Sequence, residues 1–89
     1  MNIQATITKV DLPRIGTDRK RYQLVTFRLA KGGTAISYIS PDMNNYQRWK
    51  PHLRPGAVLD NLRLLPDEKT IDADSHPKRV PTLEQPELL

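Results

Sequence analysis

Apolar and polar residues alternate along much of the chain, which is typical of strands that bury one face. In the segment 2–10, Ile3, Ala5 and Ile7 occupy every second position between polar residues, so we predict a half-buried strand there. The alternation returns in 22–30 and predicts a second strand with a core face and an outer face. The core face of that strand carries Val25, Phe27 and Leu29. Further strands are predicted over 34–40, 57–65 and 70–75.

Glycines, prolines and one acidic residue divide these strands. Gly32 and Gly33 predict a tight hairpin turn between the second and third strands, because paired glycines accept positive φ angles. The segment 11–21 contains a proline, a glycine and several cations, and we predict a long loop there. Asp42 follows the third strand as a candidate N-cap for a helix over residues 43 to about 52.

The resulting element order over residues 1–75 is β-β-β-α-β-β. This is the order of the OB-fold, and small all-β sheets of this length usually close into barrels, which remove exposed edges. We therefore predict an all-β domain with one short helix, a five-stranded OB-fold barrel. An SH3-like barrel is an alternative that the periodicity leaves open. Residues 76–89 contain three prolines, so they are predicted to form an irregular C-terminal tail.

Composition limits the chain to one small domain with a modest core. Of its 89 residues, 37% are hydrophobic and none is cysteine, which excludes a disulfide framework and a thiolate metal site. The longest apolar run, Ala57–Leu59, is far shorter than the roughly 20 residues that span a bilayer. We expect a soluble, unsecreted, cytoplasmic protein that does not bind a membrane.

Positive charge is concentrated in the first half of the chain. Residues 1–50 carry nine Lys or Arg against three Asp, and residues 51–89 carry five against seven Asp or Glu, so the net charges are +6 and −2. The densest basic stretch, 14–31, favours phosphate contacts through the release of counterions. A solvated loop whose charges only confer solubility is the alternative.

Several stretches give the chain a family resemblance. They are the start Met1–Ile7, the basic first loop, a strand that ends in Phe27–Leu29, and the stretch His52–Leu59. Within the last of these, Leu53–Gly56 resembles the turn that leads from the helix into the fourth strand of OB domains. The pattern over residues 1–75 resembles small OB-fold single-stranded-DNA-binding proteins of bacteria, phages and mobile elements. The resemblance implies that a single strand lies across the second and third strands, flanked by the loops after strands one and four.

Binding of single strands without sequence preference requires cations at phosphate spacing and aromatic surfaces on which bases stack. The predicted nucleic-acid-binding cations are Arg14, Arg19, Lys20, Arg21, Arg28 and Lys31. Tyr22 and Tyr38 are the predicted stacking residues, with an ordinary cross-strand contact as the alternative for Tyr22. Tyr38 faces a ligand only if Ile39 points inward. Trp49, on the helix, is predicted to fill the core, with a platform for base stacking as the alternative.

Catalytic and metal sites have little support in the sequence. His52 and His76 lie 24 residues apart without further ligands at metal-site spacing. Asp72 and Asp74 share a strand face that suits Mg²⁺, but no second carboxylate cluster completes such a site. We therefore predict a protein that is not an enzyme and that has no cofactor or metal.

These features predict single-stranded DNA binding with little sequence specificity, in DNA replication or recombination. The alternative is a protein-binding accessory subunit that docks on a replication enzyme such as a polymerase or helicase, and a duplex or RNA is a third candidate ligand. A homo-oligomer is compatible with either function. The tail is acidic and ends in two apolar residues, which suits capture by a partner enzyme. An inert linker end and a segment packed on its own barrel are the alternatives. The tail's predicted partner-binding residues are Glu84, Glu87, Leu88 and Leu89.

Overall fold

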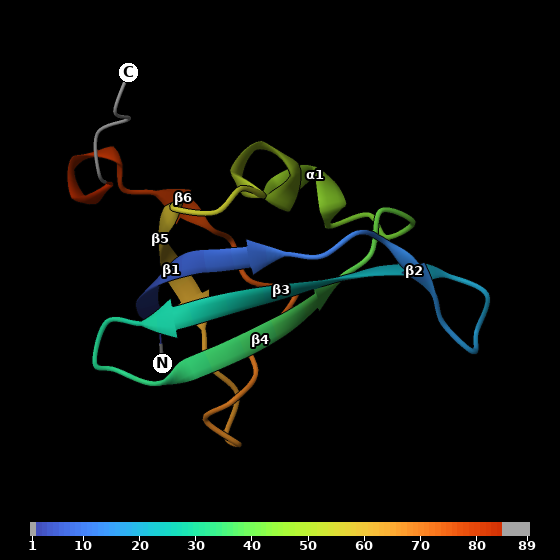
Figure 1. Cartoon of the computed structure of the whole chain (residues 1–89), viewed down its shortest axis with the longest axis horizontal. Coiled ribbons are helices and arrows are strands. Elements are labelled where there is room, and N and C mark those ends of the chain that lie inside the picture. Colours follow the sequence, from blue (N-terminus) through green and yellow to red (C-terminus); the bar gives the residue numbers. More distant parts are fainter. Residues whose placement is uncertain (1, 85–89) are drawn as a thin grey trace.

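The computed structural model describes residues 2–84, which form a six-stranded sheet and one short α-helix (Figure 1). The long strand β3 (Arg21–Leu29) lies in the middle and pairs with β1 (Asn2–Val10) and with β4 (Thr34–Ile39). The first residues of β3 also pair with the two-residue strand β2 (Arg14–Ile15). All of these ladders are antiparallel. The structure therefore confirms a mostly antiparallel β-sheet protein.

Two more strands extend the sheet beyond β1. They are β5 (Val58–Arg63), which pairs with β1, and β6 (Lys78–Arg79), which pairs with β5. At the other edge, the β3–β4 turn has Gly32 at φ 98° and Gly33 at φ 91°. Both angles are strained for residues that carry a Cβ, so the predicted glycine hairpin is confirmed.

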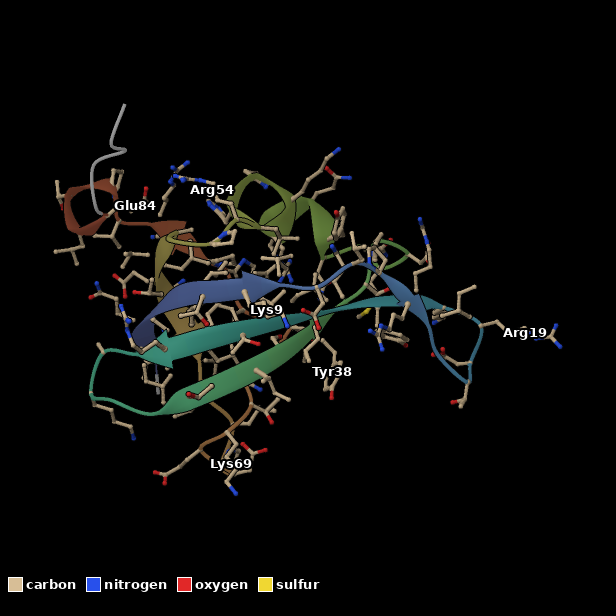
Figure 2. The ribbon with its side chains drawn as sticks, in the orientation of Figure 1. Lys9, Arg19, Tyr38, Arg54, Lys69 and Glu84 are labelled. Carbon is tan, nitrogen blue, oxygen red and sulfur yellow. The ribbon has the colours of Figure 1, made fainter. Side chains whose placement is uncertain are left out.

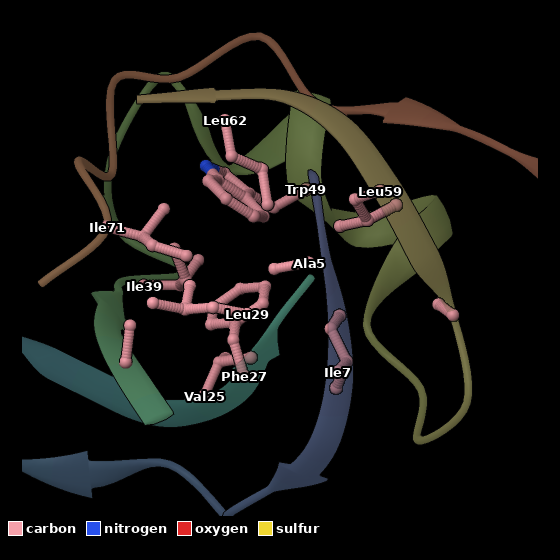
Figure 3. Close-up of a cluster of buried hydrophobic side chains, with 12 residues drawn as sticks. Ala5, Ile7, Val25, Phe27, Leu29, Ile39, Trp49, Leu59, Leu62 and Ile71 are labelled. Atoms are coloured by element: carbon pink, nitrogen blue, oxygen red, sulfur yellow. The ribbon is translucent and has the colours of Figure 1, made fainter. Parts of the chain in front are cut away.

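The inner face of the sheet encloses the hydrophobic core (Figure 3). Val25 and Phe27 are fully buried, which confirms the predicted core face of β3. The ring of Phe27 packs edge-on against that of Trp49, with ring centroids 6.3 Å apart. Trp49 is also fully buried, and its Nε1 donates to the backbone oxygen of Ala73 at 2.8 Å. Trp49 is thus the core residue that the sequence predicts.

The helix is shorter than predicted. One α-helical turn, α1 (Tyr46–Trp49), is followed by the 3₁₀ turn η1 (Lys50–His52). Pro51 has no backbone N–H with which to continue the α-helical hydrogen bonds. The predicted N-cap at Asp42 is wrong, because Asn45 occupies that position and makes no capping bond through its side chain. The carboxylate of Asp42 binds an arginine of β3 instead.

The sheet is open, whereas the sequence analysis predicts a closed five-stranded barrel. The predicted fifth strand, 70–75, makes only two isolated bridges, Ile36 with Thr70 in parallel and Leu64 with Ile71 in antiparallel orientation. A turn follows these bridges, because the backbone oxygen of Asp72 accepts from the N–H of Ser75 at 3.0 Å. The Asp72 carboxylate also accepts from the N–H of Asp74 at 2.9 Å. These local bonds remove the segment from the ladder after two residues.

The segment 76–84 packs on the sheet, although the sequence analysis predicts an irregular tail. It contains β6 and the 3₁₀ turn η2 (Pro81–Leu83), and Pro77 is buried. The backbone N–H of Val80 donates to the oxygen of Val58 at 2.9 Å. The prolines flank β6 and do not interrupt it, since only the residues between them donate to the neighbouring strand.

Candidate nucleic-acid interface

Residues 11–22, which we call the arm, project from one end of the sheet (Figure 2). The sequence analysis predicts a loop here, but the two residues of β2 pair with the start of β3. A short turn closes the arm, in which the N–H of Gly16 donates to the oxygen of Lys20 at 2.8 Å. Arg19 adopts a left-handed backbone conformation in this turn, with φ 65°. Its side chain is exposed and lies at the tip of the arm.

The outer face of β3 and β4 carries both predicted stacking residues. Ile39 is 1% exposed and Tyr38 is 55% exposed, so Tyr38 points away from the core. Leu24 lies opposite Tyr38 in the β3–β4 ladder. Tyr22 precedes Leu24 by two residues, and alternation places it on the same face. Ile39 thus points inward, as contact of Tyr38 with a ligand requires, and that contact itself stays a prediction.

A groove of about 350 Å³ lies between the arm and this outer face. The lining residues are Asp11, Leu12, Arg14, Ile15, Gly16, Tyr22, Leu24 and Tyr38. Leu12 is 84% exposed and Ile15 is 75% exposed. Two large apolar side chains that lie so near each other are seldom both this exposed. Neither residue is among the binding residues predicted from the sequence. Their signal was present, since they are the two large apolar residues of a segment otherwise rich in charge, proline and glycine.

Tyr22 is held in place at the side of this groove. Its hydroxyl donates to Asp18 Oδ2 at 2.6 Å. A Cβ added to Gly16 would lie 3.2 Å from two carbons of the Tyr22 ring, so the ring rests on the backbone of the arm. The hydrogen bond from Tyr22 lowers the pKa of Asp18, and the same bond raises the pKa of Tyr22. The ring is therefore fixed, and part of its surface is already covered.

The predicted cations divide into free and paired groups. Within residues 2–84, no ion pair is formed by Arg14, Arg19, Lys20 or Arg28. Lys31 lies 4.0 Å from Glu68, and both side chains are mostly exposed, so this pair is weak. Arg21 differs, because its Nη2 donates to Asp42 Oδ1 at 2.9 Å and its backbone N–H donates to Oδ2 at 3.0 Å.

The Arg21–Asp42 contact ties the arm to the segment before α1. It holds the pKa of the Asp42 carboxyl below its usual range, chiefly through the hydrogen bonds from Arg21. We expect Arg21→Gln to lower the melting temperature by a few degrees, because the base of the arm loses this bond. Arg19→Gln is the matched control, since it removes a free arginine from the same arm. Thermal denaturation that gives equal shifts for the two variants would contradict the structural role of Arg21.

The acidic residues considered for metal binding are used within the protein. Asp72 Oδ2 lies 2.8 Å from Nη2 of Arg63, and Asp74 Oδ1 accepts from Nδ2 of Asn45 at 2.9 Å. In the part of the chain that the structure describes, no group of three His, Cys, Asp or Glu residues is arranged to hold a metal ion.

The predicted partner-binding residues of the tail are described only in part. Glu84 is in contact with Arg54 and Arg79. Glu87, Leu88 and Leu89 lie outside the described residues. Near this contact, burial and the charge of Arg79 lower the pKa of His52, and the charge of Glu84 opposes them.

Comparison of the chain with protein-family models, with curated proteins and with solved structures finds no match. Across residues 2–84, no helix has both the length and the apolar character needed to cross a bilayer. The support for the candidate interface therefore comes from the geometry and chemistry of the chain itself.

Proposed function

We propose that the chain binds single-stranded DNA with little sequence specificity, through the arm and the outer face of β3 and β4. The groove supports this proposal best, because it brings two tyrosines and two exposed apolar residues beside Arg14, which forms no ion pair within residues 2–84. Unpaired bases stack on aromatic rings at about 1–3 kcal/mol per base, while their phosphates require cations. A role in DNA replication or recombination belongs to the same proposal and rests on the family resemblance.

The proposal includes an OB-like arrangement of the strands. Three backbone bonds support it, since they span the gap between β4 and the end of β5 where a closed barrel has its fifth strand. They are Ile36 N–H to Lys69 O at 2.9 Å, Ile71 N–H to Ile36 O at 2.8 Å, and Leu65 N–H to Thr70 O at 2.9 Å. The order of β1, β3, β4, the helix and β5 is also the predicted order.

An accessory module that binds a replication enzyme is the second candidate function. The high exposure of Leu12 and Ile15 favours it, because exposed apolar pairs are common in protein interfaces. The two candidates differ in their response to salt. Phosphate contacts weaken as salt is added, whereas an apolar protein interface changes little.

The first experiment is a titration of fluorescently labelled oligo(dT) at two salt concentrations. We expect log K to fall with log salt by about 0.7 for each phosphate neutralised. A duplex of equal length is expected to bind more weakly, because its bases cannot reach the groove. Equal affinity for both forms, or binding that is insensitive to salt, would contradict the proposal.

Charge removal from the arm tests where the phosphates bind. We expect Arg19→Gln/Lys20→Gln to weaken binding and to reduce the salt slope by about 1.4, since two phosphate contacts are lost. Arg48→Gln/Lys50→Gln removes the same residue types from exposed positions in the helical segment, where neither forms an ion pair within residues 2–84. If the two double variants lose the same affinity, net charge and not the arm determines binding.

A further inference from the structure

One carboxylate, Glu84, is held by two arginines at the edge of the sheet. Figure 2 shows Glu84 and one of them, Arg54. Arg54 Nη2 donates to Glu84 Oε2 at 2.8 Å, and Arg79 donates through Nε to Oε1 at 2.9 Å and through Nη2 to Oε2 at 3.2 Å. The Glu84 side chain is 12% exposed. Two cations share one anion, so the cluster keeps a net positive charge. We call Arg54 and Arg79 the arginine fork.

A second groove, of about 500 Å³, is lined by Arg54 of the fork, by Glu84 and by Arg28. Arg28 is also on the outer face of β3, where it lies opposite Thr6 of β1. A strand that crosses β3 toward Arg28 would therefore continue into this groove.

We infer that the arginine fork is a second phosphate-binding site, which takes a backbone phosphate of the bound strand, and that Glu84 fills the fork in the free protein. This inference rests on the proposed function. A phosphodiester and a carboxylate both accept the paired N–H bonds of a guanidinium. Exchange of one anion for the other leaves neither arginine without a partner, which avoids the cost of an unpaired, partly buried charge.

The backbone hydrogen bonds of the segment 81–84, which carries Glu84, are local. Its 3₁₀ turn η2 (Pro81–Leu83) has two backbone bonds, from Leu83 N–H to Val80 O at 3.1 Å and from Glu84 N–H to Pro81 O at 3.2 Å. Within residues 2–84, neither bond joins the turn to the sheet, so these bonds need not break when Glu84 leaves the fork. The fork itself is anchored, since Arg79 lies in β6 and is paired with Leu59 of β5.

The test measures oligonucleotide affinity of Glu84→Gln, which keeps the shape of the side chain and removes its charge. We expect a several-fold gain in affinity for an oligo(dT) of about 12 nucleotides, because the phosphate no longer competes with Glu84 for the fork. The salt slope should stay close to that of the wild-type protein, since the fork binds one phosphate in both. An oligo(dT) of about 4 nucleotides fills the first groove alone and should show no gain. Adding Arg54→Gln and Arg79→Gln to Glu84→Gln should abolish the gain.

Asp60→Asn is the matched control for net charge. Asp60 is exposed on β5 beside Lys78 of β6, close in the chain to the fork, and it forms no ion pair within residues 2–84. An equal gain from Asp60→Asn would overturn the inference, because overall charge would explain it. If the wild-type protein binds oligo(dT) and Glu84→Gln binds it no more tightly, the inference is overturned and the proposed function stays intact.

A second measurement tests the fork without an oligonucleotide. Inorganic phosphate is titrated into Glu84→Gln, and the Nε–H resonances of Arg54 and Arg79 are followed by NMR. We expect saturable shifts in Glu84→Gln and much weaker ones in the wild-type protein. Saturable shifts without a gain for the longer oligo(dT) would show a site for free phosphate only and would contradict the inference. Absence of shifts would exclude an anion site at the fork.

Discussion

Trp49→Ala is expected to lower the free energy of unfolding by about 3–5 kcal/mol, the usual cost of removing a large buried aromatic side chain. Trp49 is fully buried and is the largest side chain of the core. Its ring contacts Phe27, and its Nε1 bonds the backbone oxygen of Ala73. Total stability in domains is only about 5–15 kcal/mol, so this variant should be unfolded or nearly so. Urea denaturation followed by circular dichroism measures the loss.

Trp49→Phe separates packing from hydrogen bonding. It keeps an aromatic ring near Phe27 but loses the donor to Ala73, whose oxygen still accepts from Asn45 Nδ2 at 2.8 Å. We therefore expect a smaller loss than for Trp49→Ala. A Trp49→Ala protein that folds normally and no longer binds oligo(dT) would show instead that the indole contacts the ligand.

The sequence predicts the strands well where side-chain burial alternates. The strand 2–10 is found with the predicted bounds, and Ala5 and Ile7 are buried as expected. The pattern fails where local hydrogen bonds compete with the ladder, as in 70–75. The pattern also fails in 76–84. Prolines lie on both sides of a two-residue strand there, and in the sequence such spacing is typical of an irregular tail.

The chemistry of the candidate site is only partly visible in the sequence. The basic residues of the arm and the two tyrosines are found from composition and alternation. Whether a cation is free depends on partners far along the chain, however, as with Arg21 and Asp42, which are 21 residues apart. The fork is another such case, since Arg54 meets Glu84 across 30 residues. Leu12 is likewise exposed because the arm projects from the sheet, which an apolar residue in the sequence does not reveal.

Tyr38→Ala is expected to weaken oligo(dT) binding by about 1–3 kcal/mol, the usual cost of losing one base-stacking ring. This corresponds to a loss of roughly 5- to 150-fold in affinity. Tyr38 is 55% exposed, so the variant should remain folded. A stacking ring makes no phosphate contact, and the salt slope should therefore match that of the wild-type protein. Fluorescence anisotropy at several salt concentrations gives both quantities.

Tyr38→Phe is the matched control, because it keeps the ring and removes only the hydroxyl. Its affinity for oligo(dT) should be close to that of the wild-type protein. The affinity of Tyr22→Phe for oligo(dT) is expected to differ from that of the wild-type protein, since this variant loses the bond to Asp18 that fixes the ring against the arm. If a folded Tyr22→Ala/Tyr38→Ala variant binds oligo(dT) with full affinity, neither ring stacks on a base. The groove would then be better explained as a docking site for a protein, with Leu12 and Ile15 as its exposed apolar contacts.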